Sequence, residues 1–371
     1  MLHGVGELLV RTTVGIIRSS SDNTSADWRP IRNPIAMQLA SLLRLMRLRS
    51  LAGLVALIQF VGCTANVVQP GPAIEQPRQT TNTFVMSDGS KLPYRIWRAG
   101  GEPLAVILAL HGMNDSRDAW EYPAPELAAQ GITVIAPDQR GFGETKDRGH
   151  WPGTQALVTD AQEMVAMVRQ QYPRTRLILM GESMGAAVLM CLAASGRPLP
   201  VDGYILVAPA VWGRAEMGLF LRSFLWIATG LVPGLEVSGS IARRVASDNR
   251  QAIRRLASDP LTITATRVDA IAGLVDLMDA ALIAAPNFHG RAIVLYGGKD
   301  QMVPARATLA AWRALPAGVM RAYYPESYHL LLRDLGRMTP IDDILGWILR
   351  PADPLPSCAD RAAAAWLSNQ S

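Results

Sequence analysis

The sequence has few cysteines, and none of them has a spacing that would hold a metal ion or build an obvious disulfide framework. Cys191 lies among apolar residues of a predicted helix, where a buried small hydrophobe is more common than a reactive thiol. Cys358 stands in a proline-containing C-terminal segment that offers it no chemical role. The third cysteine, Cys63, follows a short apolar run near the N-terminus.

Internal repeats, heptad patterns and low-complexity tracts are also missing, and the aromatic residues are spread along the chain. A chain of 371 residues of which 49% are apolar can form one large domain, or a core with an inserted subdomain. We therefore expect an ordinary globular core and exclude a disordered or repetitive protein.

A basic surface stripe that could bind nucleic acid is missing as well. The formal net charge is +5, but residues 1–63 alone carry seven arginines against three acidic residues, which is +4. The rest of the chain is close to neutral, at +1. The charge distribution therefore predicts no nucleic-acid partner.

The N-terminal region has the layout of a secretory signal peptide. Arg44, Arg47 and Arg49 precede the apolar run 51–61, and Gly62 and Cys63 follow it. The run is too short to span a bilayer, which takes about 20 apolar residues. We predict a leader over residues 1–63 with the signal peptide at 37–63, whereas residues 1–36 have no clear role.

The segment Phe60-Val61-Gly62-Cys63 resembles the lipobox of bacterial lipoproteins, although Phe60 replaces the usual aliphatic residue. This resemblance implies that Cys63 is lipidated and becomes the first residue of the mature chain. The protein would then be anchored to a membrane of the bacterial cell envelope and face the periplasm. Residues 64–83 are rich in Pro, Gln, Thr and Asn, and they are predicted to form a flexible tether.

From residue 84 onward, short β-rich runs alternate with longer helical patterns. Several of the runs, such as residues 104–110, are apolar throughout, which is typical of strands covered on both faces. The alternation predicts a mostly parallel α/β sheet with helices on both sides. The predicted strands are Phe84–Met86, Tyr94–Arg98, Leu104–Leu110, Ile132–Ala136, Leu177–Met180, Tyr204–Ala208, Ile293–Tyr296 and Met320–Tyr323. The predicted helices are Ala119–Gln130, Gln155–Gln171, Met184–Ala194, Ala305–Ala314 and Leu330–Leu349.

One long interruption separates two of these strands. Residues 211–286 contain only helical or irregular patterns, first very apolar and then charged. An insertion of this size is expected to cover the C-terminal edge of the sheet, where open α/β sheets bind their ligands. We predict a catalytic domain over residues 84–350 with a cap at 211–286, followed by a tail at 351–371.

The strongest functional signal is the pentapeptide 181–185, Gly-Glu-Ser-Met-Gly, between an apolar strand and a helix of small residues. In this context a G-x-S-x-G motif places Ser183 on a tight turn as a nucleophile, and the helix N-terminus adds positive potential. A glycine turn without chemistry is the alternative.

A second loop, His111-Gly112-Met113, follows another apolar strand. Such a loop can aim the backbone amide of Met113, together with that of Met184, at the oxyanion of a tetrahedral intermediate. The side chain of His111 is better explained as a packed structural histidine.

The acid and the base are predicted from two later loops. Asp300 follows a strand in a glycine-rich loop, where its carboxylate can orient a histidine, although it could instead cap the next helix. The chain order Ser, Asp, His favours the catalytic role. His329 follows the last predicted strand by a short loop, and none of the other four histidines suits the base as well.

Residues 84–350 resemble the monoacylglycerol lipase and lysophospholipase branch of the α/β-hydrolases, a group also described as the serine aminopeptidase family. The matching motifs are His111-Gly112, Asp138–Gly143, Gly181–Gly185, Gly298–Asp300 with Val303-Pro304, and His329, in that order. In that family the segment 138–143 is structural. Glu182 departs from the family, because many members have His there.

The resemblance implies an α/β-hydrolase fold with a mostly parallel eight-stranded sheet and a helical cap inserted before the acid-bearing strand. It also implies a serine hydrolase that cleaves carboxylic esters through an acyl-enzyme on Ser183, without a metal or organic cofactor. The expected substrates are lipids of the monoacylglycerol or lysophospholipid type. Two alternatives remain: a peptidase or thioesterase on the same scaffold, and a non-catalytic lipid-anchored binding protein, which would be expected to have lost one of the three catalytic side chains.

The apolar stretch 217–231 bears on the substrate, because it is richer in large apolar residues than one buried helix face requires. It could bind an acyl chain or touch a lipid surface. It could equally pack the cap onto the core.

Overall fold

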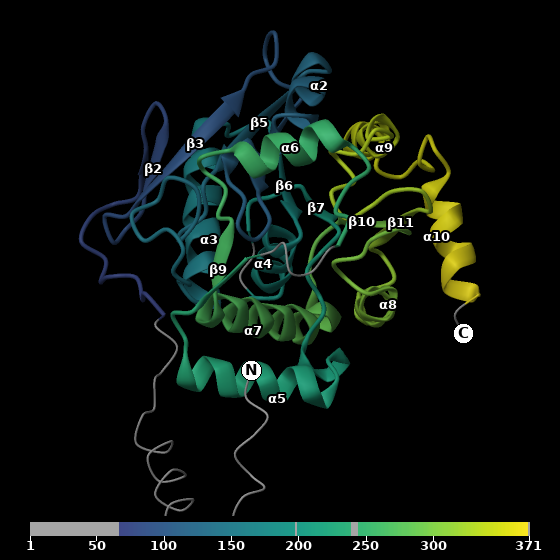
Figure 1. The fold of residues 1–371 in the computed structure, drawn as a ribbon. Helices are drawn as coiled ribbons and strands as arrows, with labels where there is room; N and C mark the ends of the chain where they lie inside the picture. Colours follow the sequence, from purple (N-terminus) through teal and green to yellow (C-terminus); the bar gives the residue numbers. More distant parts are fainter. Residues whose placement is uncertain (1–66, 197–198, 239–243, 370–371) are drawn as a thin grey trace, which may run out of the picture. The chain divides into compact units, whose positions relative to one another are not determined.

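The computed structural model describes residues 67–196, 199–238 and 244–369 (Figure 1). The predicted leader, its signal peptide and Cys63 lie outside these residues. Within the described ranges, no helix has both the length and the apolar character needed to cross a bilayer.

A nine-stranded sheet forms the centre of the fold, in the order β1-β2-β3-β5-β4-β6-β7-β10-β11. The six strands from β5 to β11 pair in parallel, and β1, β2 and β3 add an antiparallel edge. The strands are β1 (Arg78–Gln79), β2 (Thr83–Val85), β3 (Lys91–Trp97), β4 (Ala105–Leu110), β5 (Ile132–Pro137), β6 (Arg176–Glu182), β7 (Gly203–Val207), β10 (Ala292–Gly297) and β11 (Met320–Tyr324).

The mostly parallel sheet is as predicted, but the count of eight strands was one too low. The additional strand, β1, lies in the segment predicted to be a tether. It has only two residues, which pair with Phe84 and Val85 of β2. A strand of two residues shows no alternation of apolar and polar side chains, so the sequence carries no signal for it.

Helices cover both faces of the sheet. Because both faces are covered, every residue of β4 is buried, which explains why its sequence is apolar throughout. Val106 and Leu108 belong to one hydrophobic cluster with residues of α3, α4, α7 and α8, whereas Ala105 and Ile107 belong to a second cluster with residues of η1, α2 and α9. The helices are η1 (Arg117–Trp120), α2 (Pro123–Ala129), α3 (Thr154–Gln171), α4 (Met184–Ala193), α7 (Val268–Ala284), α8 (Ala305–Ala314) and α9 (Met338–Leu349).

The segment between β7 and β10 contains short strands as well as helices. Its elements are η2 (Arg214–Glu216), α5 (Leu219–Leu231), β8 (Glu236–Ser238), α6 (Arg250–Ser258), β9 (Ala265–Arg267), α7 and η4 (Ala285–Asn287). Strands β8 and β9 form a separate antiparallel pair, so the prediction of only helical or irregular structure was wrong here. Helix α7 packs on α4, and α5 packs on the outer side of α7 (Figure 1).

The C-terminal part of the chain departs from the predictions in two places. Helix α9 begins at Met338 and not at Leu330. Residues 330–337 form turns instead, and the first five of them, 330–334, are buried. Residues 359–368, predicted as part of a tail, form helix α10 (Ala359–Ser368). This helix packs on β11, where the ring of Trp366 stacks on Tyr323 with the ring centroids 4.7 Å apart.

Candidate active site

Ser183 stands on the sharp turn between β6 and α4, as the motif predicts. Its backbone has φ 52° and ψ −111°, a conformation that is strained for a residue with a side chain. A Cβ on Gly181 would lie 2.5 Å from the amide nitrogen of Ala186, and one on Gly185 would lie 2.2 Å from the carbonyl oxygen of Leu110. Both glycines are therefore required for the turn to close, and the side chain of Ser183 stays partly exposed.

The loop after β4 lies directly against this turn. A Cβ on Gly112 would be 3.4 Å from the Cβ of Ser183, and a Cβ on Gly185 would lie 2.2 Å and 2.9 Å from the carbonyl oxygens of Leu110 and His111. In the described part of the chain, neither the amide of Met113 nor that of Met184 donates a hydrogen bond to a protein acceptor. The structure thus brings together the two segments that carry the predicted oxyanion donors.

His111 is a structural residue of this loop. Its Nε2 accepts a hydrogen bond from the backbone amide of Gln139 at 3.0 Å, which leaves the proton on Nδ1, and Nδ1 donates to the carbonyl oxygen of Gly112 at 2.8 Å. Burial lowers the pKa of His111, so the ring stays neutral. Both ring nitrogens are used to hold the loop in place, as the packed-histidine interpretation predicts.

Asp300 connects the loop after β10 to the predicted base. Its Oδ1 accepts hydrogen bonds from the amides of Met302 at 2.7 Å and Val303 at 3.0 Å, and its Oδ2 lies 2.7 Å from Nδ1 of His329. Helix α8 begins after Pro304 and has no side-chain cap, so Asp300 does not cap it. One carboxylate oxygen shapes the loop, and the other is free to orient the histidine.

His329 lies in the loop after β11, with its side chain almost completely buried. Burial alone would lower the pKa of the imidazole, but the carboxylates of Asp300 and Glu182 outweigh burial and the opposing charge of Arg333. The pKa of His329 is therefore raised above its ordinary value of 6.5.

The sheet topology explains why these residues lie at the same edge of the sheet. Ser183, Asp300 and His329 each follow a parallel strand, namely β6, β10 and β11, and in the described sheet only β7 lies between β6 and β10. Parallel strands end at the same edge, so the three loops share the C-terminal edge of the sheet.

Sequence reasoning missed a buried charge cluster at this edge. A single nitrogen of Arg333, Nη2, donates to Oδ2 of Asp115 at 2.5 Å and to Oε2 of Glu182 at 2.7 Å. All three side chains are buried. The only sequence signals are the unusual Glu182 beside the nucleophile and a cation four residues after the base, and neither reveals the pairing.

The segment between β7 and β10 contacts the same loops. Asn114 Nδ2 donates to Oγ1 of Thr266 at 2.6 Å, and the carbonyl oxygen of Asn114 accepts from the amide of Ile263. The amide of Leu330, next to the predicted base, donates to the carbonyl oxygen of Ala246. These contacts hold the insertion at the C-terminal edge, above the oxyanion loop and the histidine loop.

The loop 138–143 supports the oxyanion loop, to which it is joined by the hydrogen bond between Gln139 and His111. Both carboxylate oxygens of Asp138 are used inside the protein, by Arg117 and by the amide of Glu144. A Cβ on Gly143 would overlap this carboxylate. The loop therefore has the structural role that the family resemblance implies.

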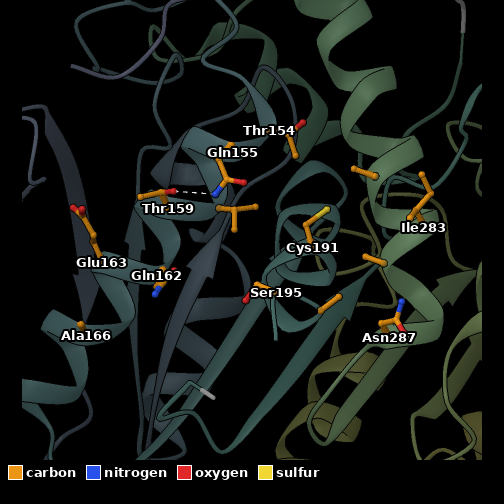
Figure 2. A pocket seen from close by; sticks show the side chains of 14 residues that line it. Thr154, Gln155, Thr159, Gln162, Glu163, Ala166, Cys191, Ser195, Ile283 and Asn287 are labelled. Atoms are coloured by element: carbon orange, nitrogen blue, oxygen red, sulfur yellow. Dashed lines mark hydrogen bonds between the residues drawn. The ribbon is translucent and has the colours of Figure 1, made fainter. Parts of the chain in front are cut away.

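An open groove of about 990 Å³ lies between α3, α4 and α7 and contains none of the predicted site residues (Figure 2). Cys191 is part of its lining. Burial raises the pKa of this thiol to about 12, so it is protonated at neutral pH and unreactive. Among the residues that the structure covers, no cluster of His, Cys, Asp or Glu has the geometry to bind a metal ion.

Comparison with protein families places residues 101–336 in a family described as serine aminopeptidase, S33. The monoacylglycerol lipase of Mycolicibacterium smegmatis is 25% identical over 279 residues, which covers 73% of this chain and 97% of the relative. The human monoglyceride lipase is 27% identical over 267 residues, which covers 71% of this chain and 88% of the relative.

Solved structures show the same fold. A soluble variant of the monoglyceride lipase from Saccharomyces cerevisiae, in complex with a substrate analog, matches with a TM-score of 0.61 at 18% identity over 75% of this chain and 98% of the other. The monoacylglycerol lipase of Paleococcus ferrophilus matches with a TM-score of 0.55 at 19% identity over 76% and 99%. The α/β-hydrolase fold with a mostly parallel sheet, predicted from the resemblance, is confirmed.

Proposed function

Because the chain belongs to the serine aminopeptidase (S33) family and is a carboxylic ester hydrolase of the α/β-hydrolase fold, we propose that it cleaves lipid esters through an acyl-enzyme on Ser183. The observation that carries this proposal is the hydrogen bond between Asp300 and His329 at the sheet edge where the strained Ser183 turn lies. The proposed substrates are of the monoacylglycerol or lysophospholipid type, and relatives named monoacylglycerol lipase, monoglyceride lipase and phospholipase support a lipid ester.

In the proposed acylation step, Nε2 of His329 takes the proton of the Ser183 hydroxyl while its oxygen attacks the ester carbonyl carbon. Asp300 holds Nδ1–H and so keeps Nε2 available as the base. The amides of Met113 and Met184 stabilise the oxyanion, and the loss of one such donor typically costs a factor on the order of 100 to 1,000 in rate. The ester C–O bond then breaks, and His329 returns the proton to the departing alcohol.

Water completes the cycle. His329 takes a proton from the water as it attacks the acyl carbon, the bond to Ser183 breaks, and the fatty acid leaves. The serine hydroxyl recovers its proton from His329. None of these steps needs a group other than protein side chains, backbone amides and water.

We further propose that the protein works at a lipid surface, held there by a lipid on Cys63 and by the outer face of α5. Large apolar residues of this helix are exposed, and the helix has no fully buried residue, which argues against packing as its main role. The amide of Val68, near the start of the described chain, donates a hydrogen bond to the carbonyl oxygen of Trp151. The ring of Trp151 packs against Gly273 of α7, and α5 packs on α7.

Only three residues separate Cys63 from Val67, so the chain can reach at most about 14 Å between the two. An anchor at Cys63 would therefore hold the side of the molecule near α7 and α5 close to the bilayer. This arrangement suits an enzyme of the bacterial cell envelope that faces the periplasm and takes its substrate from a membrane.

The nucleophile assignment is tested by Ser183→Ala, which should abolish hydrolysis of a p-nitrophenyl acyl ester without lowering the thermal midpoint. Labelling of Ser183 by a fluorophosphonate, read by mass spectrometry, should disappear in His329→Ala. Turnover by the alanine variant at residue 183 would disprove the assignment, and labelling without His329 would place the base elsewhere.

The substrate class is tested by one preparation assayed on monoacylglycerols, lysophospholipids, short esters, acyl thioesters and aminoacyl amides. Preference for the thioester or the amide would replace the lipid-ester assignment. The anchor is tested by Cys63→Ser, which should move the protein from the membrane fraction to the soluble fraction of a bacterial host. An unchanged distribution would remove the lipid anchor from the proposal.

A further inference from the structure

Three segments must keep a fixed geometry for ester hydrolysis: the Ser183 turn, the oxyanion loop after β4 and the His329 loop after β11. Each of them contributes one residue to the buried cluster of Glu182, Asp115 and Arg333. We propose that Arg333 is a positioning residue of the reaction, which fixes these three segments relative to one another. This inference rests on the proposed role of Ser183 and goes beyond it.

The cluster is placed where small displacements matter. Glu182 immediately precedes the nucleophile, Asp115 lies two residues after Met113, and Arg333 lies four residues after His329. No chain segment links these residues locally, since Arg333 is 151 residues from Glu182 and 218 from Asp115. The guanidinium therefore bonds to the other two segments at once and connects both of them to the His329 loop.

The chemistry of the cluster makes this connection stiff. The two hydrogens on Nη2 of Arg333 are each directed at a different carboxylate, so neither acid can move without losing a charge-assisted hydrogen bond. Oδ1 of Asp115 also accepts from the amide of Ser116 at 2.8 Å, which ties the carboxylate to its own loop.

The backbone of Arg333 is held as well. Its amide donates to the carbonyl oxygen of Leu330 at 2.7 Å, and its carbonyl oxygen accepts from Asn249 Nδ2 at 2.9 Å. Arg333 is therefore fixed from both ends, to the histidine loop on one side and to the insertion through Asn249 on the other. Because Arg333 itself is held in place, its side chain can fix the positions of Asp115 and Glu182 as well as neutralise their charges.

A second buried cluster of one arginine and two aspartates provides a control, because its removal should affect stability without acting directly on the three site loops. Arg140 pairs with Asp88 and Asp160, and all three side chains are buried to a similar degree. This second cluster joins the turn between β2 and β3 to helix α3 through Arg140, which lies in the structural loop 138–143, and it includes no residue of the three site loops. Both clusters contribute to the fold, but only that of Arg333 joins the reacting groups.

The test compares two neutral triple variants in the full chain. The first is Asp115→Asn, Glu182→Gln, Arg333→Met, and the second is Asp88→Asn, Arg140→Met, Asp160→Asn. Because each removes both signs of charge together, neither leaves an unpaired buried charge. The amide oxygen introduced by Asp115→Asn can still accept from the amide of Ser116. The measurements are the folded fraction, the thermal midpoint, and kcat and KM on a p-nitrophenyl ester.

We expect the first triple variant to lose roughly 100-fold in kcat per folded molecule, with KM within about twofold, since a misplacement of about 1 Å costs a factor of this size. The fluorophosphonate should label it more slowly by a similar factor. The second triple variant should lose much less kcat, because Arg140 bonds to none of the three site loops and can affect them only through its neighbour Gln139, which bonds to His111. A first variant with kcat within threefold of wild type, or an equal loss in both variants, would overturn the proposal.

If the first triple variant does not fold, the same comparison is made with Arg333→Lys and Arg140→Lys. Lysine keeps the charge, but its nitrogen lies one atom closer to the backbone than Nη2 and cannot hold both carboxylates in the same geometry, so kcat should fall more in Arg333→Lys than in Arg140→Lys. Equal kcat in both lysine variants would equally overturn the proposal. Ser183→Ala, assayed in parallel, keeps the two claims apart: if it retains turnover the proposed function fails, and if only the cluster variants retain it the positioning role fails.

Discussion

The exposed apolar side chains of α5 predict that this helix binds to a lipid surface, and their exposed fractions allow the strength of that binding to be calculated. Phe220 is 85% exposed and Trp226 is 77% exposed, although both are large apolar side chains. Arg222 is the one charged residue in this helix. Exposed aromatic side chains of this size can insert into a membrane interface. Removing the two aromatic side chains should therefore weaken attachment to a lipid surface.

The expected magnitude comes from the area that a membrane would cover. Burial of a large apolar side chain contributes about 2 kcal/mol, and about four fifths of each of these two is exposed. The pair should thus contribute about 3 kcal/mol to surface binding, which corresponds to roughly 200-fold in partitioning. The double variant Phe220→Gln, Trp226→Gln uses glutamine because it maintains helix propensity.

The assay compares two substrates for the same enzyme. All proteins carry Cys63→Ser, so that a lipid modification cannot supply the attachment. Hydrolysis of a monoacylglycerol in phospholipid vesicles, at lipid concentrations where binding limits the rate, should fall by up to roughly 200-fold in the double variant. Hydrolysis of a soluble short-chain ester should stay within about twofold of the parent.

A matched pair of leucines provides the control. Leu219, at the start of α5, is 74% exposed, and Leu104, just before β4 at the opposite edge of the sheet, is 60% exposed. Leu219→Gln should weaken vesicle hydrolysis, whereas Leu104→Gln should not. The reasoning is refuted if the double variant keeps vesicle activity within about threefold, or if it loses the same factor on the soluble ester.

The remaining predictions concern the site and the C-terminal helix. Because the pKa of His329 is raised and only its neutral ring acts as a base, kcat/KM should rise with pH through a midpoint above 6.5; Asp300→Asn should move this midpoint to lower pH and reduce kcat by roughly 10⁴-fold in a pH–rate profile. Gly185→Ala would place a methyl group 2.2 Å from the carbonyl oxygen of Leu110, so it should abolish ester hydrolysis and destabilise the fold by about 1 to 3 kcal/mol in urea unfolding. Trp366→Ala should destabilise the fold by about 2 to 3 kcal/mol without changing kcat, because the half-buried ring packs on Tyr296, Trp312 and Tyr323, none of which belongs to the three site loops; unaltered stability would mean that α10 does not contribute to the fold.

Local patterns in the chain predicted most of the sheet and selected the residues that we propose carry the chemistry. A strand buried on both faces must be apolar throughout, as residues 105–110 are, and a turn as tight as that of Ser183 needs Gly181 and Gly185 on either side. These requirements act over a few residues, so they can be recognised in the sequence. The hydrogen bond between Asp300 and His329 was predicted on the same basis, from two short loops after strands.

Tertiary structure alone decided the features that depend on distant partners. Arg333 is an ordinary surface-type residue in the sequence, and it becomes part of the site only because β4, β6 and β11 end at one edge. The exposure of α5 and the docking of α10 on β11 likewise follow from which faces the rest of the chain covers. The periodicity of a helix tells which of its faces is apolar, but whether that face meets the core or the solvent is decided by segments far away in the chain.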